Sequence, residues 1–342
     1  MDHPAGFPLN MPHPLPWQTD QAERLRRAHT ASRLPHAILL SGVAGLGKRR
    51  FCDWLAARLL CEAAAERAPC GECRGCRLLA GGSHPDLLRV GLEEGKRQLG
   101  IDAVRGLIGF VRLSSQYAGY RVALVHQADH MNRSSANSLL KTLEEPPANA
   151  VLVLVADQPA RLPATIRSRC QQVAFAAPTP RQAKDWLQAQ EASAAESLLP
   201  LCGFAPLAAI ALLQRDAASL QDRLTGQLAG LASGELTVHA AADAWPSDDL
   251  ALMLDLLIVN CQRLLRDATI GGIPELDHAL RGLPLEPDAS YGYLDYLYRT
   301  RALNDRALQP RLLVEDLLIR WQALFPKGRP PDSPKLGRTQ RQ

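Results

Sequence analysis

The stretch from Ile38 to Leu60 constrains the fold of this chain more than any other. It begins with a short apolar run that ends at Ser41, continues as Gly42-Val-Ala-Gly45-Leu-Gly47-Lys48, and ends in an amphipathic segment. This order is that of a phosphate-binding loop, in which backbone N–H groups and a helix N-terminus surround an anion and a lysine reaches the outer phosphates. The sequence therefore predicts a nucleotide phosphate site at Gly42, Gly45, Gly47 and Lys48.

The residue after Lys48 departs from this pattern. A serine or threonine hydroxyl normally stands there and ligates the magnesium that bridges the β- and γ-phosphates. This chain has Arg49, whose guanidinium cannot ligate a cation. The loop could therefore hold phosphate and still be poor at cleaving it. A glycine-rich turn between a strand and a helix, with no nucleotide, is the alternative interpretation.

Four of the eight cysteines are clustered in the pattern Cx8CxxCxxC: Cys61, Cys70, Cys73 and Cys76. In a cytosolic chain such a cluster indicates a metal site and not disulfides. Four thiolates at about 2.3 Å satisfy tetrahedral Zn²⁺, and we expect Gly71 and Gly75 to allow the tight turns of CxxC knuckles. The zinc would be structural; an iron–sulfur cluster or four unligated small hydrophobes are the alternatives. The scattered cysteines are predicted core residues: Cys52, Cys170, Cys202 and Cys261.

The remaining pattern predicts an α/β fold followed by helices. We expect strands at 37–41, 86–90, 121–126 and 151–156, alternating with helices at 18–29, 49–60, 101–113 and 133–143. Such alternation indicates a parallel sheet covered on both faces. Beyond Phe175 the chain reads as helical, starting at Thr179-Pro180 and including longer helices at 248–267 and 311–324.

The net charge of +4 is located almost entirely at the end of the chain. The stretch 326–342 carries five basic residues and one acidic residue, so the other 325 residues are close to neutral. A neutral body argues against tight DNA binding by this chain alone, because phosphate neutralisation dominates such binding. No stretch reaches the roughly 18 apolar residues of a membrane span, and the first 17 residues lack a signal-peptide core. We expect a cytoplasmic protein with no membrane association.

Two further stretches resemble the bacterial clamp loader family of AAA+ proteins: Asn137-Ser-Leu-Leu-Lys-Thr-Leu-Glu-Glu-Pro-Pro147 and Leu162-Pro-Ala-Thr-Ile-Arg-Ser-Arg-Cys170. A zinc knuckle between the first helix and the second strand is also typical of that family. The resemblance covers residues 18–325. It implies an AAA+ α/β module with a zinc-binding insertion at 1–177, a small helical lid at 178–218 and an all-α collar for ring formation at 219–326. The basic tail, 327–342, is expected to be disordered.

Members of that family that hydrolyse ATP, the gamma/tau type, end one strand in an Asp-Glu pair. The Asp helps to hold magnesium and the Glu polarises the attacking water. This chain has His126-Gln127 there, and Asp129 is out of register and is not expected to substitute. The lid arginine that contacts the γ-phosphate should fall at 203–206, where this chain has Pro206. Together with the hydroxyl that Arg49 replaces, three groups that ATP hydrolysis requires are missing. ATP could therefore bind, but we do not expect hydrolysis.

The resemblance also implies a role for Arg169. In ring-forming ATPases an arginine offered across a subunit interface neutralises charge that develops on the transferred phosphoryl group. Arg169 would complete the ATP site of an adjacent gamma/tau subunit as an arginine finger in trans. The alternative is that Arg167 and Arg169 are solvated charges in a turn. We expect Cys170 to pack beneath that turn.

The predicted function is that of a non-hydrolysing clamp loader subunit of the DNA polymerase III complex. Its partners would be gamma/tau and delta subunits in a hetero-oligomer, with the sliding clamp and primed DNA reached through the complex. An active gamma/tau-type ATPase is one alternative and would require ATP turnover by the isolated chain. A freestanding zinc-containing kinase or nucleic-acid-binding protein is the other and would require phosphotransfer or DNA affinity without partners.

Overall fold

The computed structural model describes residues 11–325 except 94–95, 97, 118, 216, 246–249, 271–277, 284 and 304–308. The chain divides into two compact units, Met1–Ile210 and Ala211–Gln342. The three domain boundaries expected from the sequence stay predictions. The expected disordered tail, 327–342, lies outside the described residues.

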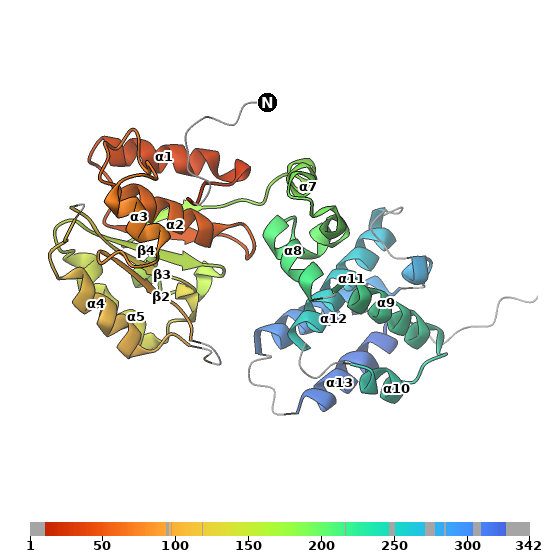
Figure 1. Ribbon diagram of the computed structural model, residues 1–342. Helices are drawn as coiled ribbons and strands as arrows, with labels where there is room; N and C mark the ends of the chain where they lie inside the picture. Colours follow the sequence, from red (N-terminus) through yellow and green to blue (C-terminus); the bar gives the residue numbers. More distant parts are fainter. Residues whose placement is uncertain are drawn as a thin grey trace, which may run out of the picture. The chain divides into compact units, whose positions relative to one another are not determined.

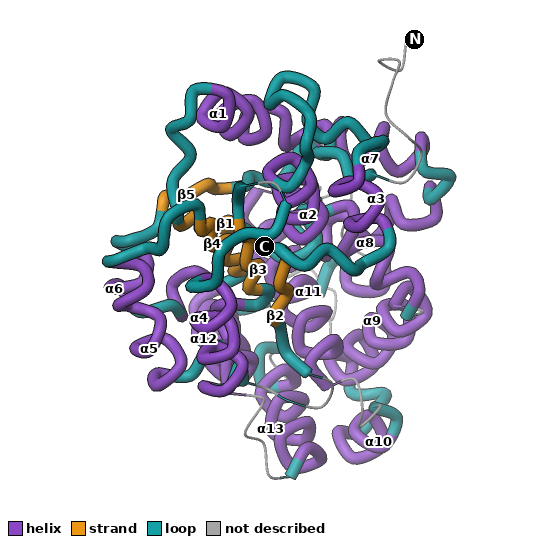
Figure 2. The backbone as a smooth tube through the Cα atoms, turned by 60° about the vertical axis from the view of Figure 1, so that its left-hand side comes forward, coloured by secondary structure: helices purple, strands orange, loops and turns teal. Residues whose placement is uncertain are grey.

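The first unit is built on a parallel sheet of five strands in the order β2-β3-β4-β1-β5. The strands are β1 (Ala37–Ser41), β2 (Leu87–Val90), β3 (Arg121–Val125), β4 (Ala150–Ala156) and β5 (Gln171–Ala174). β1 lies between β4 and β5, and its register pairs Ser41 with Ala156. Figure 2 shows the strands side by side in orange. Because the sheet is parallel, the carboxyl ends of β1, β3 and β4 meet at one edge.

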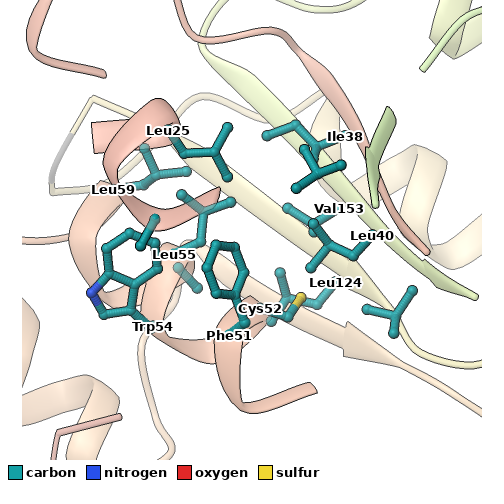
Figure 3. Close-up of a cluster of buried hydrophobic side chains, with 14 of the residues drawn as sticks. Leu25, Ile38, Leu40, Phe51, Cys52, Trp54, Leu55, Leu59, Leu124 and Val153 are labelled. Carbon is teal, nitrogen blue, oxygen red and sulfur yellow. The ribbon is translucent and has the colours of Figure 1, made fainter. Parts of the chain in front are cut away.

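Alternate residues of the central strands are buried against helices on opposite faces. Ile38 and Leu40 pack with residues of α1 (Thr19–Thr30) and α2 (Lys48–Leu59), and Figure 3 shows them facing Phe51 and Leu55. Ala37 and Leu39 pack in a second cluster with residues of α4 (Ile101–Val111) and α5 (Arg133–Glu144). These helices lie on opposite sides of the sheet in Figure 1. The expected two-sided burial is confirmed, which explains why the strands read as continuous apolar runs.

Several elements of this unit were not predicted from the sequence, among them β5 and α3. β5 is an edge strand in which only Val173 is buried, so it has no apolar run to reveal it. α3 (Arg74–Ala80) stands where knuckle turns were expected, and the thiol of its N-cap residue Cys73 accepts a hydrogen bond from the Cys76 amide. Gly71 has the expected turn conformation, with φ +77°. Gly75 lies inside α3 instead, where a Cβ atom would stand 2.3 Å from the Leu60 carbonyl oxygen.

Helical segments complete the first unit. Short helices border the strands: η1 (Pro16–Gln18), η2 (Ala128–His130), η3 (Pro159–Arg161) and α6 (Ala164–Arg167). The predicted helix start at Thr179-Pro180 is confirmed, because Thr179 and Gln182 form a capping box on α7 (Pro180–Ala189). η4 (Ser193–Cys202) and α8 (Pro206–Gln214) follow. In the described part of the chain no single helix meets the length and hydropathy of a membrane span; η4 and α8 meet them only as a pair, bent by 111°.

The described residues of the second unit are helical. Its elements are α9 (Ala217–Ser233), α10 (Val238–Asp243), α11 (Leu250–Ile270), η6 (His278–Leu280), α12 (Pro287–Leu303) and α13 (Pro310–Gln322). Trp321 is fully buried and donates its indole N–H to the Leu228 carbonyl. Asn260 and Gln221 form a buried amide pair between α11 and α9. On α12, Tyr293 is buried in the core, whereas Tyr291 is 56% exposed.

A buried ion pair anchors the loop that leads into β3. Asp86 is fully buried, and its carboxylate lies 3.1 Å from the Arg121 guanidinium. The same carboxylate accepts hydrogen bonds from the backbone amides of Gln116 and Tyr117. A buried charge is tolerated when it is paired and hydrogen-bonded, as here. Asp86 therefore holds the backbone of Gln116 and Tyr117 beside the sheet.

We expect Asp86→Ala to lower the free energy of unfolding by about 3–5 kcal/mol, because it leaves the Arg121 charge buried and unpaired. Urea denaturation of the full chain measures the change. The matched control is Asp185→Ala, which removes a carboxylate that is 65% exposed and lies 3.7 Å from Arg181. The control should change stability by about 0.5 kcal/mol or less. Equal changes in the free energy of unfolding for the two variants would contradict the stabilising role of Asp86.

Candidate functional site

The glycine loop follows β1 directly and its shape depends on glycine at three positions. Gly45 and Gly47 have φ +80° and +79°, in the left-handed region that other residues avoid. A Cβ atom at Gly42 would stand 2.5 Å from the Phe175 carbonyl oxygen, and one at Gly45 would stand 2.4 Å from the Ala208 side chain. The loop is therefore packed closely between β5 and the start of α8.

The segment before α1 fixes the same loop from another direction. Trp17 and Gln18 both donate side-chain hydrogen bonds to the carbonyl of Leu46, at 3.0 and 2.8 Å. The amide of Leu207, in the first turn of α8, donates to the carbonyl of Gly45. Two loop carbonyls are thus held by parts of the chain that lie far away in sequence.

Lys48 is folded back into the loop. Its ammonium group donates to the carbonyls of Gly42 and Val43, both at 2.6 Å, and forms an ion pair with Asp157 at 2.6 Å. The lysine side chain is only 3% exposed. Since an ammonium group has three N–H donors, these three partners use all of them.

A cavity of about 270 Å³ lies beside Lys48 at the carboxyl edge of the sheet. The residues that line it are Gly45, Gly47, Lys48, Arg49, His126, Gln127, Val155, Asp157 and Leu207. The cavity therefore brings together the glycine loop, the carboxyl ends of β3 and β4 and the start of α8. The phosphate site at Gly42, Gly45, Gly47 and Lys48 stays a prediction. Leu207 also lines the cavity, and it directly follows 203–206, the segment where the resemblance placed a lid arginine.

His126 and Gln127 carry no charge that could hold magnesium. His126 is 5% exposed, and neither ring nitrogen has a hydrogen-bond partner among the described residues. Burial, helped by the nearby Arg49 guanidinium, lowers the pKa of His126 from 6.5 to about 4. Gln127 uses its side-chain oxygen to accept the amide of Leu92. Magnesium prefers oxygen ligands, so a neutral imidazole does not replace the missing carboxylate.

Asp129 has a structural position, as its register suggested. It is buried, and its carboxylate accepts the backbone amides of Asp157 and Gln158 at 3.1 and 2.7 Å. The residue therefore fixes the backbone that follows β4. It does not line the cavity.

Arg169 lies at the end of the turn that follows α6. Its guanidinium forms an ion pair with Glu144 at 2.6 Å and donates to the carbonyl of Thr165. The side chain is 36% exposed, so it is accessible from solvent. Cys170 is buried beneath the turn as expected, and burial raises the pKa of its thiol to about 12.

The four clustered cysteines converge on one point. The sulfur atoms of Cys61, Cys70, Cys73 and Cys76 all lie within 4.8 Å of one another. Backbone amides point at each sulfur, for example Cys70 N–H to Cys61 Sγ and Gly71 N–H to Cys76 Sγ, both at 3.3 Å. Amide donors of this kind stabilise thiolates, so the group is a candidate metal site.

The scattered cysteines are buried or half-buried, which confirms them as packing residues.

Arg58 supports this cluster and was not singled out from the sequence. Its side chain is buried, and it donates hydrogen bonds to the carbonyls of Ala65 and Ala68, in the loop between Cys61 and Cys70. A buried guanidinium that holds two carbonyls fixes the path of a loop. The sequence signal for Arg58 is that it stands among the apolar residues of α2, a position where a charged side chain is unusual.

Comparisons with known proteins agree with this geometry. The family described as "DNA polymerase III, delta subunit" matches residues 17–179. DNA polymerase III subunit delta′ of Pseudomonas aeruginosa is 35% identical over 323 residues, which is 90% of this chain and 97% of that protein. This chain belongs to the family of DNA polymerase III delta′ subunits. The expected α/β fold, with a parallel sheet followed by helices, is confirmed by the structure. The delta′ subunit of Escherichia coli is 36% identical over 63% of this chain and 65% of its own length.

Part of this delta′ family member is also similar to a second type of subunit. DNA polymerase III subunit tau of Escherichia coli is 36% identical over 140 residues, which is 41% of this chain and 21% of that protein. The delta′ match extends over nine-tenths of the chain, whereas the tau match covers less than half. The delta′ assignment is therefore preferred over the gamma/tau alternative.

The buried His126 predicts a pH dependence for this delta′ family member. Its pKa is about 4 in the folded chain and 6.5 ordinarily, so between these values the unfolded chain binds the extra proton. The contribution of neutral His126 to the free energy of unfolding is therefore fully present above pH 6.5. It is lost as the pH falls toward 4, and the loss is about 3 kcal/mol at most. We expect His126→Gln to lose less stability between pH 7.5 and 5 in urea titrations. His278→Gln, at an exposed position, should behave as the parent chain; an unchanged slope in His126→Gln would refute the assignment.

Proposed function

We propose that this chain is the non-hydrolysing delta′ subunit of a DNA polymerase III clamp loader. It acts with gamma/tau and delta subunits in a hetero-oligomeric ring that places the sliding clamp on primed DNA. The observation that carries the proposal is the contrast between two sites. The cavity beside Lys48 has Arg49 and His126 at the positions of magnesium ligands, whereas Arg169 presents a guanidinium to solvent.

The first half of this contrast concerns ATP hydrolysis by the chain itself. Phosphoryl transfer relies on a metal that neutralises phosphate charge and on a group that orients the water. Arg49 and the neutral His126 hold no magnesium, and the Gln127 side chain is turned to the amide of Leu92. Each missing support costs several kcal/mol of transition-state stabilisation. Nucleotide at Gly42, Gly45, Gly47 and Lys48 would therefore remain uncleaved.

The second half concerns hydrolysis in the neighbouring subunit. Arg169 is the finger that reaches the ATP site of an adjacent gamma/tau subunit. Its position supports this role, because the turn after α6 is held by the buried Ile166 and Cys170 while the guanidinium stays at the surface. A positioned guanidinium of this type accelerates phosphoryl transfer by about 10³–10⁵ in GTPases. The chain thus contributes one charge and a rigid support.

Arg169→Ala tests the finger in the reconstituted clamp loader. We expect turnover at the adjoining ATP site to fall by about 10³-fold, while the complex still assembles in size-exclusion chromatography. Arg169→Lys should rescue little, since lysine lacks the planar fork of donors. Arg161→Ala, at an exposed position in η3, is the matched control. Unchanged ATPase in Arg169→Ala would remove the assignment, and ATP turnover by the isolated parent chain would contradict the non-hydrolysing role.

We also propose that the cysteine cluster holds one structural Zn²⁺. Four sulfurs at 2.3 Å from a tetrahedral ion lie about 3.8 Å apart, and Cys61 and Cys73 have their sulfurs 3.9 Å apart. With four thiolates the coordination is closed, so the ion would join α2 to α3 and take no part in a reaction. Among the described residues this is the one group of candidate metal ligands.

Metal analysis tests the zinc site directly. The purified chain should contain one zinc per molecule, and Cys73→Ser should reduce this content to near zero and lower the melting temperature, because metal binding contributes to folding. Cys202→Ser, which changes a half-buried cysteine outside the cluster, should retain the zinc. An iron–sulfur absorption spectrum, or full zinc content in Cys73→Ser, would overturn the proposal.

A further inference from the structure

The ion pair between Lys48 and Asp157 is the feature of the cavity that the proposed function leaves unexplained. In a phosphate-binding loop the lysine is the cation that contacts the outer phosphates. Here the ammonium group has the Asp157 carboxylate at 2.6 Å and two loop carbonyls at 2.6 Å. All three of its N–H donors have an acceptor from the chain itself.

The position of Asp157 is fixed by the surrounding structure. Ser41 and Ala156 are register partners in neighbouring strands, so the residues that follow them emerge side by side. The backbone amide of Asp157 is held in addition by the buried carboxylate of Asp129, at 3.1 Å. The contact with Lys48 therefore follows from the sheet register and from a second, buried acid.

Asp157 also determines the charge of the cavity. Among the described residues that line it, Asp157 is the one carboxylate, and the two cationic side chains are Lys48 and Arg49. Arg49 is exposed and has no ion pair or hydrogen bond to any described residue. Without the carboxylate, the cavity would present two cations and the N-terminal end of α2, a helix of 12 residues, to an anion.

We propose that Asp157 is an internal counter-ion that occupies Lys48 in place of a phosphate group and so keeps oligophosphates out of this cavity. Neutralising it opens the site to the triphosphate group, carried by a nucleotide or free as tripolyphosphate. Binding there requires no Mg²⁺, because after neutralisation the described lining residues include no carboxylate to ligate the metal and Arg49 supplies a positive charge in its place. The binding behaviour proposed here concerns the isolated chain. It rests on the proposed non-hydrolysing function only for the consequence that it would have within the clamp loader ring.

Isothermal titration of the isolated full chain with tripolyphosphate and with ATP, each in Mg²⁺ and in EDTA, tests this inference. We expect Asp157→Asn to bind at least about tenfold more tightly than the parent chain, equally well in EDTA, and without release of phosphate. Binding of both ligands indicates a site for the triphosphate group alone, and binding of ATP alone indicates that the base contributes. The double variant Lys48→Ala with Asp157→Asn should lose the gain.

Asp53→Asn is the matched control. Asp53 pairs with Arg89 at 3.0 Å and lies close enough to influence His126, so its removal changes the local charge by the same amount but leaves Lys48 paired. Asp157→Ser repeats the titration with a smaller neutral side chain, so that a folding defect of one variant does not decide the result.

Three results would overturn the inference. They are parent-chain affinity equal to that of Asp157→Asn, no gain in either folded variant at position 157, and the same gain in Asp53→Asn. Failure in this assay leaves the Arg169 role untouched, because that role is measured as ATPase activity of the assembled ring.

Discussion

Burial of β1 and β4 on both faces fixes the register on which the cavity depends. Apolar side chains from two helical layers cover these strands, and a slip of one residue would turn each layer's contacts to the opposite face. The register sets Ser41 beside Ala156 and Val125 beside Leu154. The glycine loop, His126 and Asp157 therefore leave the same edge of the sheet, where parallel sheets bind their ligands. The Lys48–Asp157 contact is thus a consequence of core packing.

The glycine loop keeps its shape through contacts within the chain. Trp17 and Gln18 hold the Leu46 carbonyl, and the start of α8 holds that of Gly45. The Trp17 ring also packs edge-on against Trp186 of α7, with ring centroids 5.4 Å apart. An aromatic pair of this kind adds about 0.5–1.5 kcal/mol beyond area burial. Packing within the protein therefore maintains the geometry of the loop, independently of any bound ligand.

Much of this arrangement could be predicted because its signals are local. The apolar runs of β1, β3 and β4, the Thr179 cap and the CxxC spacing each lie within a few residues of sequence. β5 escaped prediction because an edge strand with one buried residue has no periodic signal. Asp157 and Glu144 escaped it for another reason. Their roles come from pairing with Lys48 and Arg169, partners that are brought close only by the folded sheet.

The two ion pairs of the site differ in the exposure of their cations, whereas the carboxylates of Asp157 and Glu144 are similarly exposed, at 44% and 49%. The Lys48 side chain is buried, so removing its partner Asp157 without a replacement anion would leave a buried charge unpaired and lower the stability. Arg169 and Glu144 are 36% and 49% exposed, and an ion pair in solvent contributes about 0–1 kcal/mol. Glu144 can therefore orient the Arg169 guanidinium without withholding it, since a phosphate in a drier interface offers stronger, charge-assisted hydrogen bonds. In the proposed roles, the buried Lys48 would keep the chain's own pocket closed, and the more exposed Arg169 would act in the pocket of a neighbouring subunit.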